Sequence, residues 1–114
     1  MDPCRLLGSA AAIAKAEASG ESTLIARAGH TLVTTVAVCR RGDRIADPIS
    51  PAGWTEEVGA IVKGRFELVF DDETRTLDAG QAAAIDERQP HQWRCLSERG
   101  VLYRVALKAF GESR

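Results

Sequence analysis

The sequence predicts an all-β fold, an antiparallel sandwich or a small barrel. Short runs rich in β-branched and aromatic residues recur along most of the 114-residue chain, which is typical of strands. Turn signals built on Gly, Pro and Asp separate these runs at intervals of about 8–12 residues. The chain shows no internal repeat and no alternation of strand and helix patterns, so a parallel α/β fold is excluded.

The N-terminal part of the chain has a different composition. Residues 10–17 are rich in Ala with Lys and Glu, which are good helix formers. Ser9 can cap a helix at its start, and Gly20 can end it. We therefore predict a short helix within a lead-in of residues 1–20.

From residue 22 onward the chain has the composition of strands. Residues 31–39 (TLVTTVAVC) are apolar on both faces, so we expect one face to meet the core and the other a second sheet or subunit. In residues 65–70, Phe66, Leu68 and Phe70 alternate with Arg65, Glu67 and Val69, which predicts a strand with one buried face. The predicted strands are residues 23–26, 31–39, 57–63, 65–70, 75–77, 81–85, 91–96 and 101–107.

Residues 40–53 form the longest irregular segment. Pro48 and Pro51 each lack a backbone N–H and force extended geometry on the preceding residue, so this segment cannot lie inside a sheet. We expect this segment to form a loop at the rim of the fold, because such loops often line binding sites. The whole chain, residues 1–114, is predicted to be one domain whose β-barrel covers residues 22–110.

Composition narrows the function classes. Hydrophobic residues make up 45% of the chain, charged residues 27%, and the net charge is -1, as in soluble globular domains. The sequence shows no basic stripe and no apolar run near the roughly 20 residues that span a bilayer, so neither nucleic acid nor membrane is expected as a partner. Cys4, Cys39 and Cys95 follow no disulfide or zinc pattern, and Asp2 stands where a signal peptide is basic. We therefore expect a cytoplasmic protein without disulfides.

One motif near the end of the predicted strands resembles the second motif of the cupin superfamily. That motif reads Gly, five residues, Pro, one residue, Gly, two residues, His. Gly80 and His91 stand at its two ends with the same spacing, while Asp86 and Arg88 replace the inner Pro and Gly. The resemblance extends over roughly residues 28–107 and implies a jelly-roll barrel with a ligand pocket in its mouth.

The first cupin motif matches only at its end. Glu57 and Gly64 keep its spacing of Glu, six residues, Gly. The family usually carries His-x-His three or four residues before this Glu, and its place is taken here by Pro51 and Gly53, or Ser50 and Ala52. Of the four usual metal ligands only Glu57 and His91 remain, fewer than a transition metal normally takes. The resemblance therefore implies no conventional metal centre.

The pocket is expected around Glu57 and His91, which are also the candidate catalytic residues and the candidate metal ligands. A buried carboxylate beside an imidazole can act as general acid and base, or can form a neutralised polar pair that binds a ligand. By strand alternation, Trp93 shares a face with His91, and it can pack in the core or form an aromatic wall. The predicted pocket residues are Trp54, Glu57, Ile61, Phe66, His91, Trp93 and Tyr103.

Three hypotheses about function follow. The first is a cytoplasmic cupin-like homodimer that binds a small organic ligand without a cofactor. The second is a metal-dependent enzyme of dioxygenase or isomerase type that holds a divalent transition metal weakly through Glu57 and His91. In that case the further ligands would be Asp43, Asp47 or His30. The third is a non-catalytic interaction module whose pocket is filled by Trp93, Phe66 and Tyr103.

Overall fold

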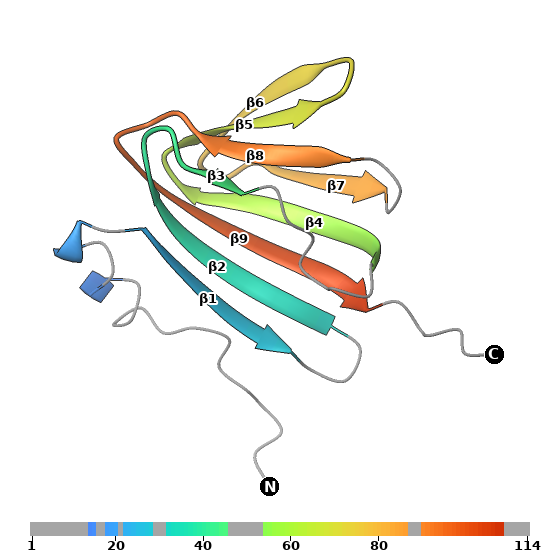
Figure 1. Ribbon diagram of the computed structural model, residues 1–114, viewed down its shortest axis with the longest axis horizontal. Helices are drawn as coiled ribbons and strands as arrows, with labels where there is room; N and C mark the ends of the chain where they lie inside the picture. The colour runs from blue at the N-terminus through green and yellow to red at the C-terminus, as the bar shows by residue number, and fades with distance from the viewer. Residues whose placement is uncertain are drawn as a thin grey trace, which may run out of the picture.

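The computed structural model describes residues 14–15, 18–20, 22–28, 32–45, 54–86 and 90–108, which contain nine strands in two antiparallel sheets (Figure 1). The five-stranded sheet has the order β1 (Thr23–Ala28), β2 (Leu32–Arg40), β9 (Arg99–Lys108), β4 (Trp54–Lys63) and β7 (Ala82–Asp86). The four-stranded sheet has the order β3 (Arg44–Ile45), β8 (His91–Cys95), β5 (Arg65–Phe70) and β6 (Thr74–Asp78). The predicted all-β antiparallel architecture is confirmed.

Several element bounds differ from the prediction, and three of these differences have a clear cause. β3 was predicted as irregular, yet Arg44 and Ile45 pair with Arg94 and Trp93 of β8. β4 begins at Trp54, which pairs with Lys108 across a register shift, instead of at residue 57. β9 begins at Arg99 because its first residues continue the pairing with β2. In each case, pairing with a strand that is distant in the sequence determines which residues belong to the element. Local composition cannot show such pairing.

The predicted N-terminal helix is described only in part. Residues 14–15 and 18–19 are helical, and a turn follows at Gly20. The φ of Gly20 is 77°, the left-handed conformation in which glycine commonly ends helices. The remainder of the predicted helix lies outside the described residues. No helix in the described part of the chain is long and apolar enough to cross a membrane.

The main core lies between the two sheets. Trp93, Phe66 and Leu102 are each 0% exposed, and they come from β8, β5 and β9. Alternate side chains on each strand face this core, as the pleat of a strand requires. Its other buried members are Ala37, Cys39, Ile61, Leu68, Leu77, Ile85 and Cys95.

A second apolar cluster lies on the other face of the five-stranded sheet. Val36, Val38 and Val101 are buried there, and Tyr103 packs against them. Tyr103 was expected to face the barrel interior, and this prediction is wrong. The pairing of Tyr103 with Val36 places it on the outer face, while Leu102 pairs with Ala37 of the main core. β9 is apolar on both faces, so alternation alone could not tell which face is internal.

The outer face also carries exposed apolar side chains. Leu32 and Leu107, which pair with each other, are 43% and 42% exposed, and Val58 is 42% exposed. Such a surface is compatible with a protein partner. The expected homodimer stays a prediction.

Candidate functional site

The centre of the barrel is organised around Glu57 on β4. Glu57 pairs with Ala106 of β9 on one side and with Ile85 of β7 on the other, so it lies inside the five-stranded sheet and not at an edge. Its side chain points between the sheets and is 0% exposed. A carboxylate buried this deeply requires hydrogen bonds and compensating positive charge.

Two side chains of β8, on the facing sheet, supply contacts to this carboxylate. The indole N–H of Trp93 donates to Oε2 of Glu57 at 3.0 Å. Nε2 of His91 lies 3.2 Å from Oε1 of Glu57. His91 and Trp93 are two residues apart, so strand alternation puts both on the inner face. The structure thus brings together Glu57, His91 and Trp93, which are three of the predicted pocket residues.

Arg104 of β9 is a fourth member of this network, which we call the Glu57 network. Nη1 of Arg104 lies 3.9 Å from Oε2 of Glu57, and the Arg104 side chain is 3% exposed. Its Nε–H donates to the hydroxyl of Thr35 at 3.1 Å. Sequence reasoning missed Arg104, although a single arginine inside the apolar run VLYRVAL is a signal of a buried ion pair.

The network decides the charge of Glu57. Burial by itself would raise the pKa of this carboxyl. The hydrogen bonds from His91 and Trp93, together with the Arg104 charge, outweigh burial and lower the pKa below its ordinary value of 4.5. Glu57 is therefore an anion at neutral pH, held by donors and charges that the chain itself provides.

A pH dependence of stability follows from this lowered pKa. The folded chain binds the Glu57 proton more weakly than the unfolded chain, so the contribution is present above pH 4.5 and is lost as the pH falls through the lowered value. We expect the urea midpoint to fall between about pH 6 and about pH 3, and to fall less in Glu57→Gln. Asp43→Asn is a second comparison, because the pKa of Asp43 is also lowered and its removal measures the part of the acid loss that does not come from Glu57. Equal acid losses in the wild type and Glu57→Gln would contradict the assignment.

The other predicted pocket residues lie elsewhere. Ile61 and Phe66 are 2% and 0% exposed and form part of the main core instead of lining an open site. Trp54 begins β4, but its side chain lies outside the described residues, and Tyr103 lies on the outer face. Trp93 packs in the main core and also donates a hydrogen bond to Glu57, and its role as an aromatic wall for a ligand stays a prediction.

Among the further candidate metal ligands, Asp43 is described, and it does not join Glu57 and His91. The backbone carbonyl of Asp43 accepts a hydrogen bond from the N–H of Cys95, at the opposite end of β8 from His91. The Asp43 carboxylate accepts from the backbone N–H of Arg40 and from the Ser22 hydroxyl. His30 and Asp47 lie outside the described residues.

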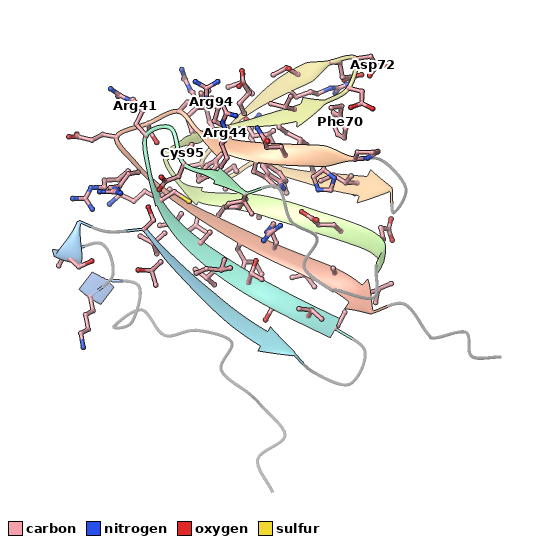
Figure 2. All side chains as sticks on the ribbon, viewed as in Figure 1. Arg41, Arg44, Phe70, Asp72, Arg94 and Cys95 are labelled. Atoms are coloured by element: carbon pink, nitrogen blue, oxygen red, sulfur yellow. The ribbon has the colours of Figure 1, made fainter. Side chains whose placement is uncertain are left out.

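An open groove lies beside the Glu57 network. It has a volume of about 290 Å³ and lies between the β5–β6 hairpin and β7, at the edges of the two sheets. The ring of Phe70 forms one wall and is 6.2 Å from the ring of His91, centroid to centroid. Phe70 and Asp72 lie toward the hairpin end of the molecule (Figure 2). The lining residues are Leu68, Phe70, Asp72, Glu73, Arg75, Ala83 and Ala84.

The donor set around Glu57 does not fit a transition metal. Both carboxylate oxygens of Glu57 already face groups that donate hydrogen bonds or carry positive charge. The Arg104 guanidinium would repel a metal cation placed at Oε2. In the part of the chain that the structure describes, no three His, Cys, Asp or Glu side chains form a group that could hold a metal.

Comparison with known proteins agrees with this fold. A family model described as a cupin domain matches residues 52–105. A cupin superfamily structure from Desulfitobacterium hafniense is similar with a TM-score of 0.67 and 13% identity, over 78% of this chain and 79% of that chain. An RmlC-like cupin from Shewanella frigidimarina has a TM-score of 0.63 and 19% identity, over 82% of this chain and 81% of that chain. A search of curated proteins found no match.

Similarity also extends to a domain of a larger protein. The Cupin_2 domain of an XRE family transcriptional regulator from Enterobacter cloacae has a TM-score of 0.63 and 19% identity, over 78% of this chain and 97% of that domain. The antiparallel two-sheet barrel, the family match and these structures define the class. The fold is that of cupin superfamily structures, and a cupin family model matches residues 52–105, the part of the chain that contains the end of the first motif and the second motif.

Proposed function

We propose that this chain is a cupin that binds a small organic ligand in the groove beside Phe70, without a conventional metal centre. One observation carries the proposal. The Glu57 carboxylate is enclosed by Trp93, His91 and Arg104, whereas an open groove of about 290 Å³ lies on the other side of Phe70. The Glu57 network then holds the two sheets together and supports the groove wall.

The lining of the groove indicates the kind of ligand. Phe70, Leu68 and Ala83 offer an apolar wall on which a flat or apolar body can pack. The rim is charged: Arg75 lies 2.6 Å from Glu73, and both side chains are largely exposed. Ligand sites commonly have volumes of about 300–1,000 Å³, so the groove suits a small molecule. We infer a ligand with an apolar body and a polar group that reaches Arg75 or Glu73.

The geometry favours binding over catalysis by Glu57 and His91. The side chains of Glu57 and His91 are 0% and 4% exposed, and the Phe70 ring lies on the groove side of His91. A general acid or base must come within hydrogen-bond reach of the reacting group. The interaction-module hypothesis expected Trp93, Phe66 and Tyr103 to fill the pocket. Phe66 and Trp93 do lie in the core, so ligand binding is inferred from the separate groove beside Phe70.

A ligand screen by thermal shift tests the proposal. We expect ligands that raise the melting temperature of the wild type to lose about tenfold or more in affinity in Phe70→Ala and Arg75→Gln. Val69→Ala is the matched control, because Val69 precedes Phe70 on β5 and lies on the opposite face of the sheet. Affinity should be measured by calorimetry, since Phe70→Ala also removes packing.

Two outcomes would overturn parts of this proposal. Ligands that bind Phe70→Ala and Arg75→Gln as tightly as the wild type would show that the groove is not the site. Elemental analysis of protein purified without chelator is expected to find transition metal well below one atom per chain. A near-stoichiometric metal would overturn the metal-free interpretation and favour the enzyme hypothesis.

A further inference from the structure

Two arginines lie side by side on the outer face of the four-stranded sheet. Arg44 of β3 pairs directly with Arg94 of β8, and their neighbours Ile45 and Trp93 face the other way, toward the core. Both arginines are exposed, with the Arg94 side chain 44% accessible. Like charges directly opposite each other on neighbouring strands destabilise a sheet. This pair therefore destabilises the fold as long as no partner is bound to it.

The turn between β2 and β3 adds a third arginine, Arg41. Arg40 ends β2, and Nε–H of Arg41 donates to the carbonyl of Leu96 at 3.1 Å, which fixes Arg41 beside the end of β8. Arg41, Arg44 and Arg94 gather on the side of the molecule away from Phe70 and Asp72 (Figure 2). We call Arg41, Arg44 and Arg94 the arginine cluster.

Only part of this positive charge is compensated within the described residues. The Asp43 carboxylate accepts hydrogen bonds from the backbone N–H of Arg40 and the Ser22 hydroxyl, so it is engaged with its own turn. Oε1 of Glu67 lies 3.8 Å from Nη1 of Arg94. No carboxylate in the described parts of the chain forms an ion pair with the side chain of Arg44.

We propose that the arginine cluster docks an acidic segment of a partner protein. The planar guanidinium matches a carboxylate with two parallel hydrogen bonds, a geometry that lysine cannot supply. An acidic segment would also relieve the repulsion between Arg44 and Arg94. The cluster is short, because the next residue in the same cross-strand row is the acidic Glu67 on β5, so it suits a few carboxylates and not a long polyanion.

Nucleic acid fits this surface less well. Single strands bind on aromatic platforms, and no aromatic side chain of the described residues lies on the outer face of the four-stranded sheet. Phe66 and Trp93, from β5 and β8, are buried in the core. A duplex is read by a helix or a two-stranded ribbon in its groove, whereas the cluster lies on a sheet face and a turn. The net charge of -1 also disfavours a long polyanion.

The test is fluorescence anisotropy with a short labelled peptide of alternating aspartate and glutamate. We expect binding to the wild type in about 20 mM salt that weakens strongly at about 500 mM salt. The double variant Arg44→Gln/Arg94→Gln should lose about tenfold or more in affinity. Arg65→Gln is the matched control, because Arg65 is an exposed arginine on the same sheet whose charge is neutralised by Asp78 at 2.6 Å.

Several outcomes would overturn the proposal. Failure of the peptide to bind the wild type in low salt is one such outcome, and a loss of affinity in Arg65→Gln as large as that in the double variant is another. Tighter binding of a DNA duplex than of the peptide would make nucleic acid the partner instead. A thermal melt separates misfolding from lost binding, since removal of the like-charged pair should leave the melting temperature unchanged or raised. A clear drop in that temperature would show that the two arginines stabilise the fold.

Discussion

Glu57→Ala is expected to lower the free energy of unfolding by about 3–5 kcal/mol, the usual cost of removing one partner from a buried ion pair. The substitution removes the carboxylate that accepts the Trp93 N–H and faces His91. It also leaves the Arg104 guanidinium buried without the negative charge that lies 3.9 Å away. Chemical denaturation at neutral pH measures the loss.

The neighbouring residue provides a matched control for this prediction. Glu56 precedes Glu57 on β4 and its side chain is exposed, so Glu56→Ala should change stability by no more than about 0.5 kcal/mol. Glu57→Gln keeps the shape and should cost less than Glu57→Ala, because the amide oxygen can still accept the Trp93 N–H. Similar losses in Glu56→Ala and Glu57→Ala would show that Glu57 does not organise the barrel centre.

Gly59→Ala is expected to cost about 1–3 kcal/mol or more, as overpacking of a filled core does. A Cβ on Gly59 would lie 2.3 Å from Cζ2 and 2.7 Å from Cη2 of Trp93. The indole is 0% exposed, and its N–H bond to Glu57 holds the ring in place. The added methyl group therefore meets a side chain that has no room to move.

A double-mutant cycle tests whether the indole causes this cost. Trp93→Ala alone should lose about 3–5 kcal/mol, since it removes a large buried side chain. In that background, Gly59→Ala should be nearly neutral, because the atoms that it would meet are gone. Denaturant unfolding of the four proteins gives the coupling energy. An equal cost of Gly59→Ala in both backgrounds would assign the effect to the strand backbone instead.

The local signals in the sequence were sufficient for the architecture. Alternation in residues 65–70 predicted the buried face of that strand, and the turn glycines Gly42, Gly64 and Gly80 all have positive φ. The motif spacing also led to Glu57 and His91, which meet at 3.2 Å. These features depend on neighbours within a few residues or on a fixed motif spacing, so the sequence alone contains them.

The arginine cluster, in contrast, could not be predicted from the sequence. No basic stripe is visible along the chain, yet Arg41, Arg44 and Arg94 gather on one surface (Figure 2). Pairing of β3 with β8 creates this cluster. A short strand of two residues has no recognisable pattern of its own, so the cluster could not be predicted from composition.

The sequence by itself determined an all-β antiparallel barrel of the cupin type, with Glu57, His91 and Trp93 at its centre, because strand alternation and motif spacing are local properties. The tertiary structure alone decided that Arg104 faces Glu57 while Tyr103 lies on the outer face. It also decided where the groove beside Phe70 opens. The physical reason is that β9 is apolar on both faces, so only the packing of the two sheets selects which face is buried between them.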